Sequence, residues 1–384
     1  MRPFVDFYAQ NQISPVTQDI SDLQKHFSRR DFLYRYLGLS PLSFEGKRII
    51  EFGPGSGHNA LYIVSRKPAR YVLVDGNPTA KEHCASLFAQ YMQGQWKMEF
   101  VLSDIVDFVT NERFDIVLCE GVIPLQKNPA DFARHIAHFV KPGGVLVLTT
   151  IDYVSCLPEL LRRLICACVI PRNGSIQTQL DLIRPIMKAH FETLEGRSRP
   201  IDDWILDNII NPWRDNLFSM ADAISTLDTE FDLYGASPHI FTDWRWYKKI
   251  TIGKQQLNQR AIEAFSRLRL SFLDHRFPQV NSDPALAAKV SDLSEEIFRL
   301  MTRIEEGDTA LIEEAANKVE AIILLIRELL PVTATALREV VSFLKSPNTL
   351  NPMECFPEFK ACFGQAQQYL SFVRRPETYS CSSA

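Results

Sequence analysis

The chain has 384 residues, of which 46% are hydrophobic and 23% charged, with 16 glycines and 22 prolines. These proportions are typical of a globular protein of about two domains, and they exclude collagen-like and wholly disordered chains. The 42 Lys and Arg residues stand against 46 Asp and Glu, so the formal net charge is −4. Because no basic stripe is present to neutralise phosphates, we expect no nucleic-acid partner.

The sequence also lacks the patterns of secreted and membrane proteins. Its opening residues, MRPFVDFYAQNQISP, show no basic segment followed by an apolar one, and the most apolar stretches, near 160–170 and 319–330, are short and interrupted by charge. We therefore expect a cytoplasmic protein without membrane contact and with reduced cysteines. Cys166 and Cys168 have no His pair nearby, so no metal site is predicted.

Residues 1–45 form the first predicted unit, an N-terminal helical segment. Leu23, Phe27 and the apolar cluster at 32–37 recur at helical spacing, and Gly38 and Pro41 end the pattern.

From Gly46 onward, short β-rich runs alternate with longer helix-compatible stretches. Each run is apolar on both faces, as expected for strands of a parallel sheet that helices cover. The runs are RIIEFG, RYVLVDG, MEFVLSD, FDIVLCEG and GGVLVLTT. This pattern predicts an α/β fold with a doubly wound, mostly parallel sheet.

The composition changes again after Gly253, because strand-like runs and most glycines disappear. Apolar residues from 290 to 304 fall at 3-4 spacing behind an Asp-Pro start and before Gly307, which predicts an amphipathic helix. Similar spacing recurs at 312–329, 257–273, 336–344 and 359–373. We predict a C-terminal α-helical bundle over 255–375 with a packed core, followed by a tail at 376–384. Self-association through this bundle is an additional expectation.

The glycine-rich segment RIIEFGPGSG at 48–57 carries the clearest chemical signal. Glycines at every second residue allow a tight turn and a close approach of backbone to a ligand, at the start of a helix. A dinucleotide fingerprint would need a third glycine at position 58, which is His58. A P-loop would need a lysine, and none lies in this segment. The spacing therefore disfavours NAD and nucleoside triphosphates.

The segment EFGPGSG resembles the first motif of the class I S-adenosylmethionine-dependent methyltransferases. Further matches follow in the family's order: Asp75 ends the second strand, Asp104 ends the third, Glu120 follows the fourth, and KPGG precedes the fifth. The resemblance covers about residues 46–150. It implies S-adenosyl-L-methionine as cofactor and a methyltransferase domain over 46–254, in which 151–254 form an acceptor cap.

The resemblance also implies roles for individual residues. Asp75 would accept hydrogen bonds from the ribose hydroxyls, and Asp104 from the adenine amine, with the backbone N–H of Ile105 on a ring nitrogen. Glu120 would bind the methionine ammonium group or act as a base. The predicted cofactor-binding residues are Glu51, Gly53, Gly55, Gly57, Asp75, Asp104, Ile105 and Glu120.

Acceptor recognition is predicted outside these motifs, in the segment 202–247, which holds four of the five tryptophans. Apolar walls with interspersed polar groups suit a site that excludes water and orients a substrate. We predict Trp204, Trp213, His239 and Asp243 as acceptor contacts. His239 is the predicted general base, because its unperturbed pKa of about 6.5 suits proton removal near neutral pH. The alternative is that the aromatic residues only attach helices to the sheet domain.

These patterns predict an enzyme that transfers a methyl group from S-adenosylmethionine to an unidentified acceptor, most simply a small molecule. An alternative is a non-catalytic S-adenosylmethionine-binding or scaffold protein that acts through its helical bundle. A Rossmann oxidoreductase is disfavoured by His58 in the glycine segment.

Overall fold

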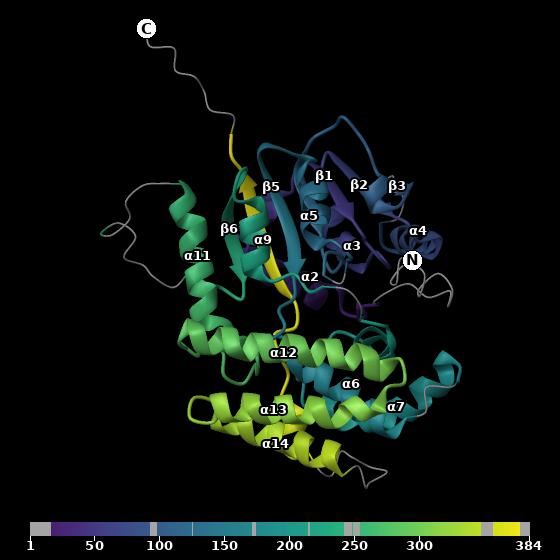
Figure 1. The fold of residues 1–384 in the computed structure, drawn as a ribbon. Helices are drawn as coiled ribbons and strands as arrows, with labels where there is room; N and C mark the ends of the chain where they lie inside the picture. Colours follow the sequence, from purple (N-terminus) through teal and green to yellow (C-terminus); the bar gives the residue numbers. More distant parts are fainter. Residues whose placement is uncertain are drawn as a thin grey trace.

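The computed structural model describes residues 17–92, 98–124, 126–170, 174–213, 216–241, 248, 254–346 and 356–376. Within these ranges the chain forms a sheet domain with helices on both faces and a layer of helices below it (Figure 1).

The sheet has seven strands in the order β3-β2-β1-β4-β5-β7-β6. Strands β1 to β5 pair in parallel, and β7 pairs antiparallel with both β5 and β6. The strands are β1 (Arg48–Phe52), β2 (Arg70–Asp75), β3 (Glu99–Leu102), β4 (Phe114–Cys119), β5 (Val140–Thr150), β6 (Phe231–Ser237) and β7 (Gln368–Arg374). This confirms the predicted doubly wound, mostly parallel sheet.

Two apolar cores cover the faces of the sheet, because the side chains of each strand alternate between them. Ile50 and Phe52 of β1 belong to one core, and Ile49 to the other. The first core includes residues of α5 (Pro129–Ala137), α9 (Met220–Leu227) and α11 (Lys254–Leu268). The second includes residues of α2 (Leu23–Tyr36), α3 (His58–Ser65) and α4 (Pro78–Met92).

A third core holds the helical layer together, and it draws on residues from 151 to 362. The layer lies beyond the carboxyl ends of the parallel strands (Figure 1). Its helices are α6 (Leu157–Val169), α7 (Ile176–Phe191), α8 (Ile201–Ile205), α12 (Pro284–Glu305), α13 (Ile312–Ile326) and α14 (Pro331–Lys345). The segments that we predicted as a cap (151–254) and as a separate bundle (255–375) therefore share one core, because α6 packs directly on α12 and α14.

The prediction of helix over 359–373 is wrong. Residues Phe359–Ala361 form one short 3-10 turn (η7), and Gln368–Arg374 form strand β7, which lies between β5 and β6 in the sheet. Strand β6, inside the predicted cap, was also missed. Both strands are stabilised by pairing partners far away in the sequence, which a search for local periodicity does not detect.

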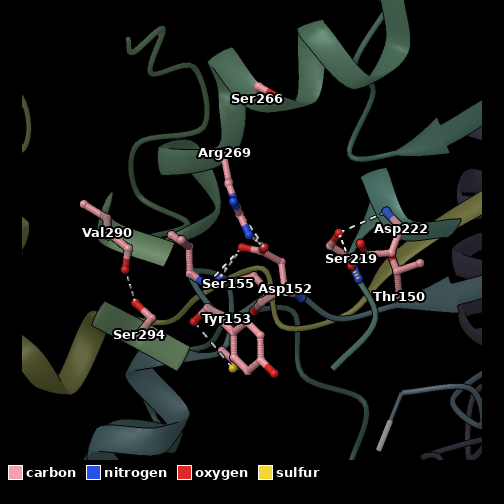
Figure 2. Close-up of polar contacts among 12 residues, drawn as sticks. Thr150, Asp152, Tyr153, Ser155, Ser219, Asp222, Ser266, Arg269, Val290 and Ser294 are labelled. Atoms are coloured by element: carbon pink, nitrogen blue, oxygen red, sulfur yellow. Dashed lines mark hydrogen bonds and ion pairs between the residues drawn. The ribbon is translucent and has the colours of Figure 1, made fainter. Parts of the chain in front are cut away.

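A buried ion pair lies where the chain leaves β5 for the helical layer (Figure 2). Asp152 is 1% exposed, and its carboxylate accepts hydrogen bonds from the backbone N–H of Val154 and from the Arg269 guanidinium. Arg269 begins the short turn η4 (Arg269–Phe272) after α11. The pair thus joins the end of β5 to the chain that leads into α12.

No helix within the described ranges is both long and apolar enough to cross a membrane.

Candidate functional site

A cavity of about 550 Å³ lies between the carboxyl ends of the parallel strands and the helical layer. One wall comes from the loops that follow β1, β2, β3 and β4. The other comes from residues 199–213 and from residues 366–369 at the start of β7. Ligands of open α/β sheets bind at this edge, and the volume is within the range of small-molecule sites.

The glycine segment forms the floor of the cavity. Gly53 and Gly55 line it with φ angles of +71° and +56°, which residues other than glycine rarely adopt. A Cβ atom on Gly53 would lie 2.4 Å from Cγ2 of Val122. Gly57 does not line the cavity; it precedes α3 at a φ of +82° and packs against Cys84. The segment is therefore folded so that bare backbone faces the cavity.

Asp75 is the last residue of β2 and Asp104 follows the neighbouring strand β3 by two residues, and both line the cavity. The Asp75 carboxylate accepts a hydrogen bond of 2.8 Å from the backbone N–H of Asn77, and burial raises its pKa. Asp104 is the N-cap of the short turn η2 (Ile105–Asp107), and Ile105 lines the cavity beside it. The structure thus brings together the three residues for which the sequence predicted contacts with a nucleoside.

Glu51 and Glu120 occupy the inner end of the cavity, and Arg30 of α2 lies against Glu120. One Arg30 Nη2 atom donates to both Glu120 oxygens at 2.7 Å, and the Tyr34 hydroxyl donates to the same carboxylate at 2.9 Å. The side chains of Arg30 and Glu120 are only 8% and 7% exposed. Sequence analysis missed Arg30 and Tyr34, because the pattern of their helical segment does not indicate that they contact Glu120, which is far away in the sequence.

Burial raises the pKa of Glu51 to about 7, with a further contribution from the neighbouring Glu120 charge and an opposing hydrogen bond from the Tyr71 hydroxyl. The ordinary glutamate value is 4.5, so the folded protein retains a proton that the unfolded chain releases between these pH values. Stability is therefore lost as the pH rises from about 4.5 to about 7.

We expect Glu51→Gln to reduce this pH dependence. The wild-type free energy of unfolding should fall by up to about 3 kcal/mol from this group between about pH 4.5 and 8, and the variant should lack that part of the fall. Urea titrations at several pH values measure the slope. Glu159 is buried in α6 with a pKa of about 7, so it contributes to the pH dependence of stability of both the wild type and Glu51→Gln. Glu159→Gln is the matched control, because it removes a buried carboxyl group with a similarly raised pKa from another part of the chain. An unchanged slope in Glu51→Gln would contradict the assignment.

The opposite wall contains two of the predicted acceptor residues. Trp204 and Trp213 line the cavity, and the Trp213 indole N–H donates to the backbone carbonyl of Asp207 at 3.1 Å. Asp207 lines the same wall and forms an ion pair of 2.8 Å with Arg199. Trp204 also packs against Phe363, so the alternative role of joining segments applies to it as well.

His239 does not line the cavity. The structure places it after β6 on the surface, exposed, with its ring 6.4 Å from that of Tyr36. The prediction of His239 as the general base is therefore not supported by its position, because a base must reach the acceptor proton. His239 was predicted to share a site with Trp204 only because both residues belong to the segment 202–247. Asp243 lies outside the described residues.

Two cavity residues, Gln367 and Tyr369, come from the C-terminal segment that we predicted to be helical. They reach the site because β7 runs antiparallel between β5 and β6, so that its first residues lie beside the carboxyl end of β5. The segment QYLSFVR shows no strict alternation of polar and apolar residues, so the β-favouring Tyr369, Phe372 and Val373 were the available local signal for this strand.

A protein-family model described as a methyltransferase domain matches residues 25–195. This part of the chain is therefore similar to methyltransferase domains. The resemblance drawn from the motifs is thereby confirmed, and the matched segment begins early enough to include Arg30 and Tyr34.

Curated relatives match only part of this chain. The tRNA U34 carboxymethyltransferase of Methylococcus capsulatus is 29% identical over 126 residues, which cover 32% of this chain and 38% of the relative. The mitochondrial ubiquinone biosynthesis O-methyltransferase of Schizosaccharomyces pombe is 34% identical over 117 residues, covering 28% and 39%. The chain thus spans about two fifths of the length of these relatives.

Among solved structures, the N-methyltransferase NodS of Bradyrhizobium japonicum, determined with S-adenosyl-L-homocysteine, is similar at 20% identity and a TM-score of 0.30. The match covers 36% of this chain and 67% of NodS. The strand-end residues of the cavity lie within the segment that the family model matches, whereas Trp204, Trp213, Gln367 and Tyr369 lie beyond it.

Proposed function

We propose that this protein transfers the methyl group of S-adenosylmethionine to a small acceptor bound in the cavity. The observation that carries the proposal is the placement of Asp75 and Asp104 at the ends of adjacent strands, on the rim of the glycine floor. Open sheets bind nucleosides at this edge, and carboxylates there accept hydrogen bonds from ribose hydroxyls and from an adenine amine.

The residues of the cavity fit this cofactor. A Cβ at Gly53 would meet Val122, so only bare backbone leaves room at this point of the floor. Asp75 would accept from the ribose and Asp104 from the adenine amine, with the Ile105 N–H beside it. Glu120 would bind the methionine ammonium group, because Arg30 and Tyr34 fix its carboxylate at the inner end of the cavity.

When bound, S-adenosylmethionine supplies an electrophilic methyl group, which an acceptor lone pair takes as the carbon–sulfur bond breaks and its electron pair returns to sulfur. The protein's contribution is to hold the acceptor in line with that bond and to exclude water, and the wall of Trp204 and Trp213 suits both tasks. Because Arg30 and Tyr34 donate hydrogen bonds to Glu120, we assign its carboxylate to binding the methionine ammonium group rather than to removing a proton.

The direct test is calorimetric titration with S-adenosylhomocysteine, alongside NAD as a comparison. We expect saturable binding of S-adenosylhomocysteine and none of NAD. Gly53→Ala should abolish most of the binding, because its Cβ forces the floor to move. Gly46→Ala is the matched control: Gly46 has a similar φ of +66°, but nothing lies within 4 Å of its Cβ position.

Circular dichroism and thermal melts show whether both variants fold. Equal affinity in Gly53→Ala and Gly46→Ala, or wild-type binding of NAD in preference to S-adenosylhomocysteine, would contradict the proposal. An assay for methyl transfer distinguishes this function from that of a non-catalytic cofactor-binding protein.

We also propose a small-molecule acceptor, in keeping with the partly enclosed cavity, and a cytoplasmic site of action.

A further inference from the structure

Gln367 and Tyr369 lie two residues apart where the chain enters β7, and both line the cavity. Alternate residues of an extended chain point to the same face, so the two side chains act as a pair. Tyr369 is opposite Thr149 of β5 and Ser237 of β6. Tyr369 also lies close enough to Glu120 for the Glu120 charge to contribute, after burial, to the raised pKa of Tyr369.

The polar ends of this pair have no hydrogen-bond partner among the residues that the structure describes. The neighbouring glutamines differ: Gln368 Nε2 donates to the Gln365 carbonyl at 2.8 Å, and Gln365 Nε2 donates to the Gln367 carbonyl at 3.5 Å. Burial raises the pKa of Tyr369, so its hydroxyl remains neutral. A neutral phenol and a carboxamide each donate and accept hydrogen bonds, and leaving such groups half-buried and unpaired is costly.

The charges on this side of the cavity are already balanced. Arg199 and Asp207 pair with each other at 2.8 Å, and no lysine occurs among the described lining residues. An acceptor with a phosphate or carboxylate group would thus enter a partly enclosed space in which the Arg199 guanidinium is already paired, which is unfavourable. The carboxylates that also line the cavity are assigned to the cofactor by the proposed function, so an ammonium group on the acceptor would compete with the cofactor for them. Trp204 and Trp213 line the cavity and contribute apolar surface to it.

We propose that Gln367 and Tyr369 bind the hydroxyl groups of an uncharged, hydroxyl-bearing acceptor, of the chemical class of a neutral pyranoside. Hydroxyl groups are donors and acceptors at once, so they match the carboxamide and the phenol, while the carbon face of a sugar ring matches the indoles. This inference rests on the proposed function, because it assigns the strand-end part of the cavity to the cofactor.

The test uses the full chain saturated with S-adenosylhomocysteine and three probes that share a pyranose ring: methyl α-glucopyranoside, glucose 6-phosphate and glucosamine. Ligand-observed NMR titrations measure their dissociation constants. We expect the neutral glucoside to bind more tightly than the two charged probes. Gln367→Leu and Tyr369→Phe should each weaken it by about 2- to 10-fold, the effect of one lost hydrogen bond.

Two exposed residues provide matched controls outside the cavity: Gln177→Leu on α7 and Tyr234→Phe on β6 should leave glucoside binding unchanged. All four variants should bind S-adenosylhomocysteine as the wild type does. Tighter binding of a charged probe, or no binding of any probe to the loaded protein, would overturn the acceptor class. Unchanged glucoside affinity in both cavity variants would overturn the role of the pair. Failure of the wild type to bind S-adenosylhomocysteine would instead refute the proposed function.

Discussion

We expect Arg30→Met to lower the free energy of unfolding by about 3 kcal/mol or more. Among the residues that the structure describes, the substitution leaves the buried Glu120 carboxylate with the Tyr34 hydroxyl as its hydrogen-bond donor, and removal of one member of a buried ion pair typically costs about 3 to 5 kcal/mol. Urea denaturation measures the change. The double variant Arg30→Met/Glu120→Gln should recover much of the loss, because no unpaired charge remains.

Arg35→Met is the matched control for this prediction. Arg35 lies on the same helix but is exposed, with its guanidinium 5.9 Å from the ring of Phe32, so its loss should change stability by no more than about 0.5 kcal/mol. If Arg30→Met and Arg35→Met are equally stable, or if the double variant is no better than Arg30→Met, the pair does not hold α2 to the site.

The second large effect is expected at Asp75. Asp75→Ala should weaken S-adenosylhomocysteine binding by about 10- to 150-fold, because it removes charge-assisted hydrogen bonds worth roughly 1.5 to 3 kcal/mol. Asp75→Asn should lose less, since an amide oxygen still accepts one hydrogen bond. Calorimetric titration of each protein gives the dissociation constants.

Asp107 supplies the control for Asp75. It is exposed at the end of η2 and does not line the cavity, so Asp107→Ala removes one negative charge near the site without removing a proposed contact. A small, equal change in both variants would indicate a general electrostatic effect. A folded Asp75→Ala protein with wild-type affinity would refute the ribose contact.

The cavity is lined both by the segment that the family model matches and by the remainder of the chain. The strand ends provide the proposed cofactor contacts, whereas Trp204, Trp213, Gln367 and Tyr369 come from segments beyond the matched domain. Because the helical layer shares one core from 151 to 362, the acceptor wall is fixed by packing far from the cavity.

The sequence by itself determined the parts whose signals are local. Five apolar runs predicted five parallel strands, the glycine spacing predicted a backbone floor, and Asp75 and Asp104 were placed at strand ends before the structure was known. Each of these signals lies within about ten residues, where hydrophobic periodicity and turn chemistry act directly.

Only the tertiary structure decided which distant residues join them. Strand β7 appears in the sheet because it pairs with β5 and β6, which brings Gln367 and Tyr369 into the cavity. Arg30 reaches Glu120 across 90 positions of sequence, and His239, predicted as the base, lies on the surface beside Tyr36. These outcomes depend on which elements pack together, because a contact between distant segments is stabilised by burial and pairing that leave no mark in the local pattern of either segment.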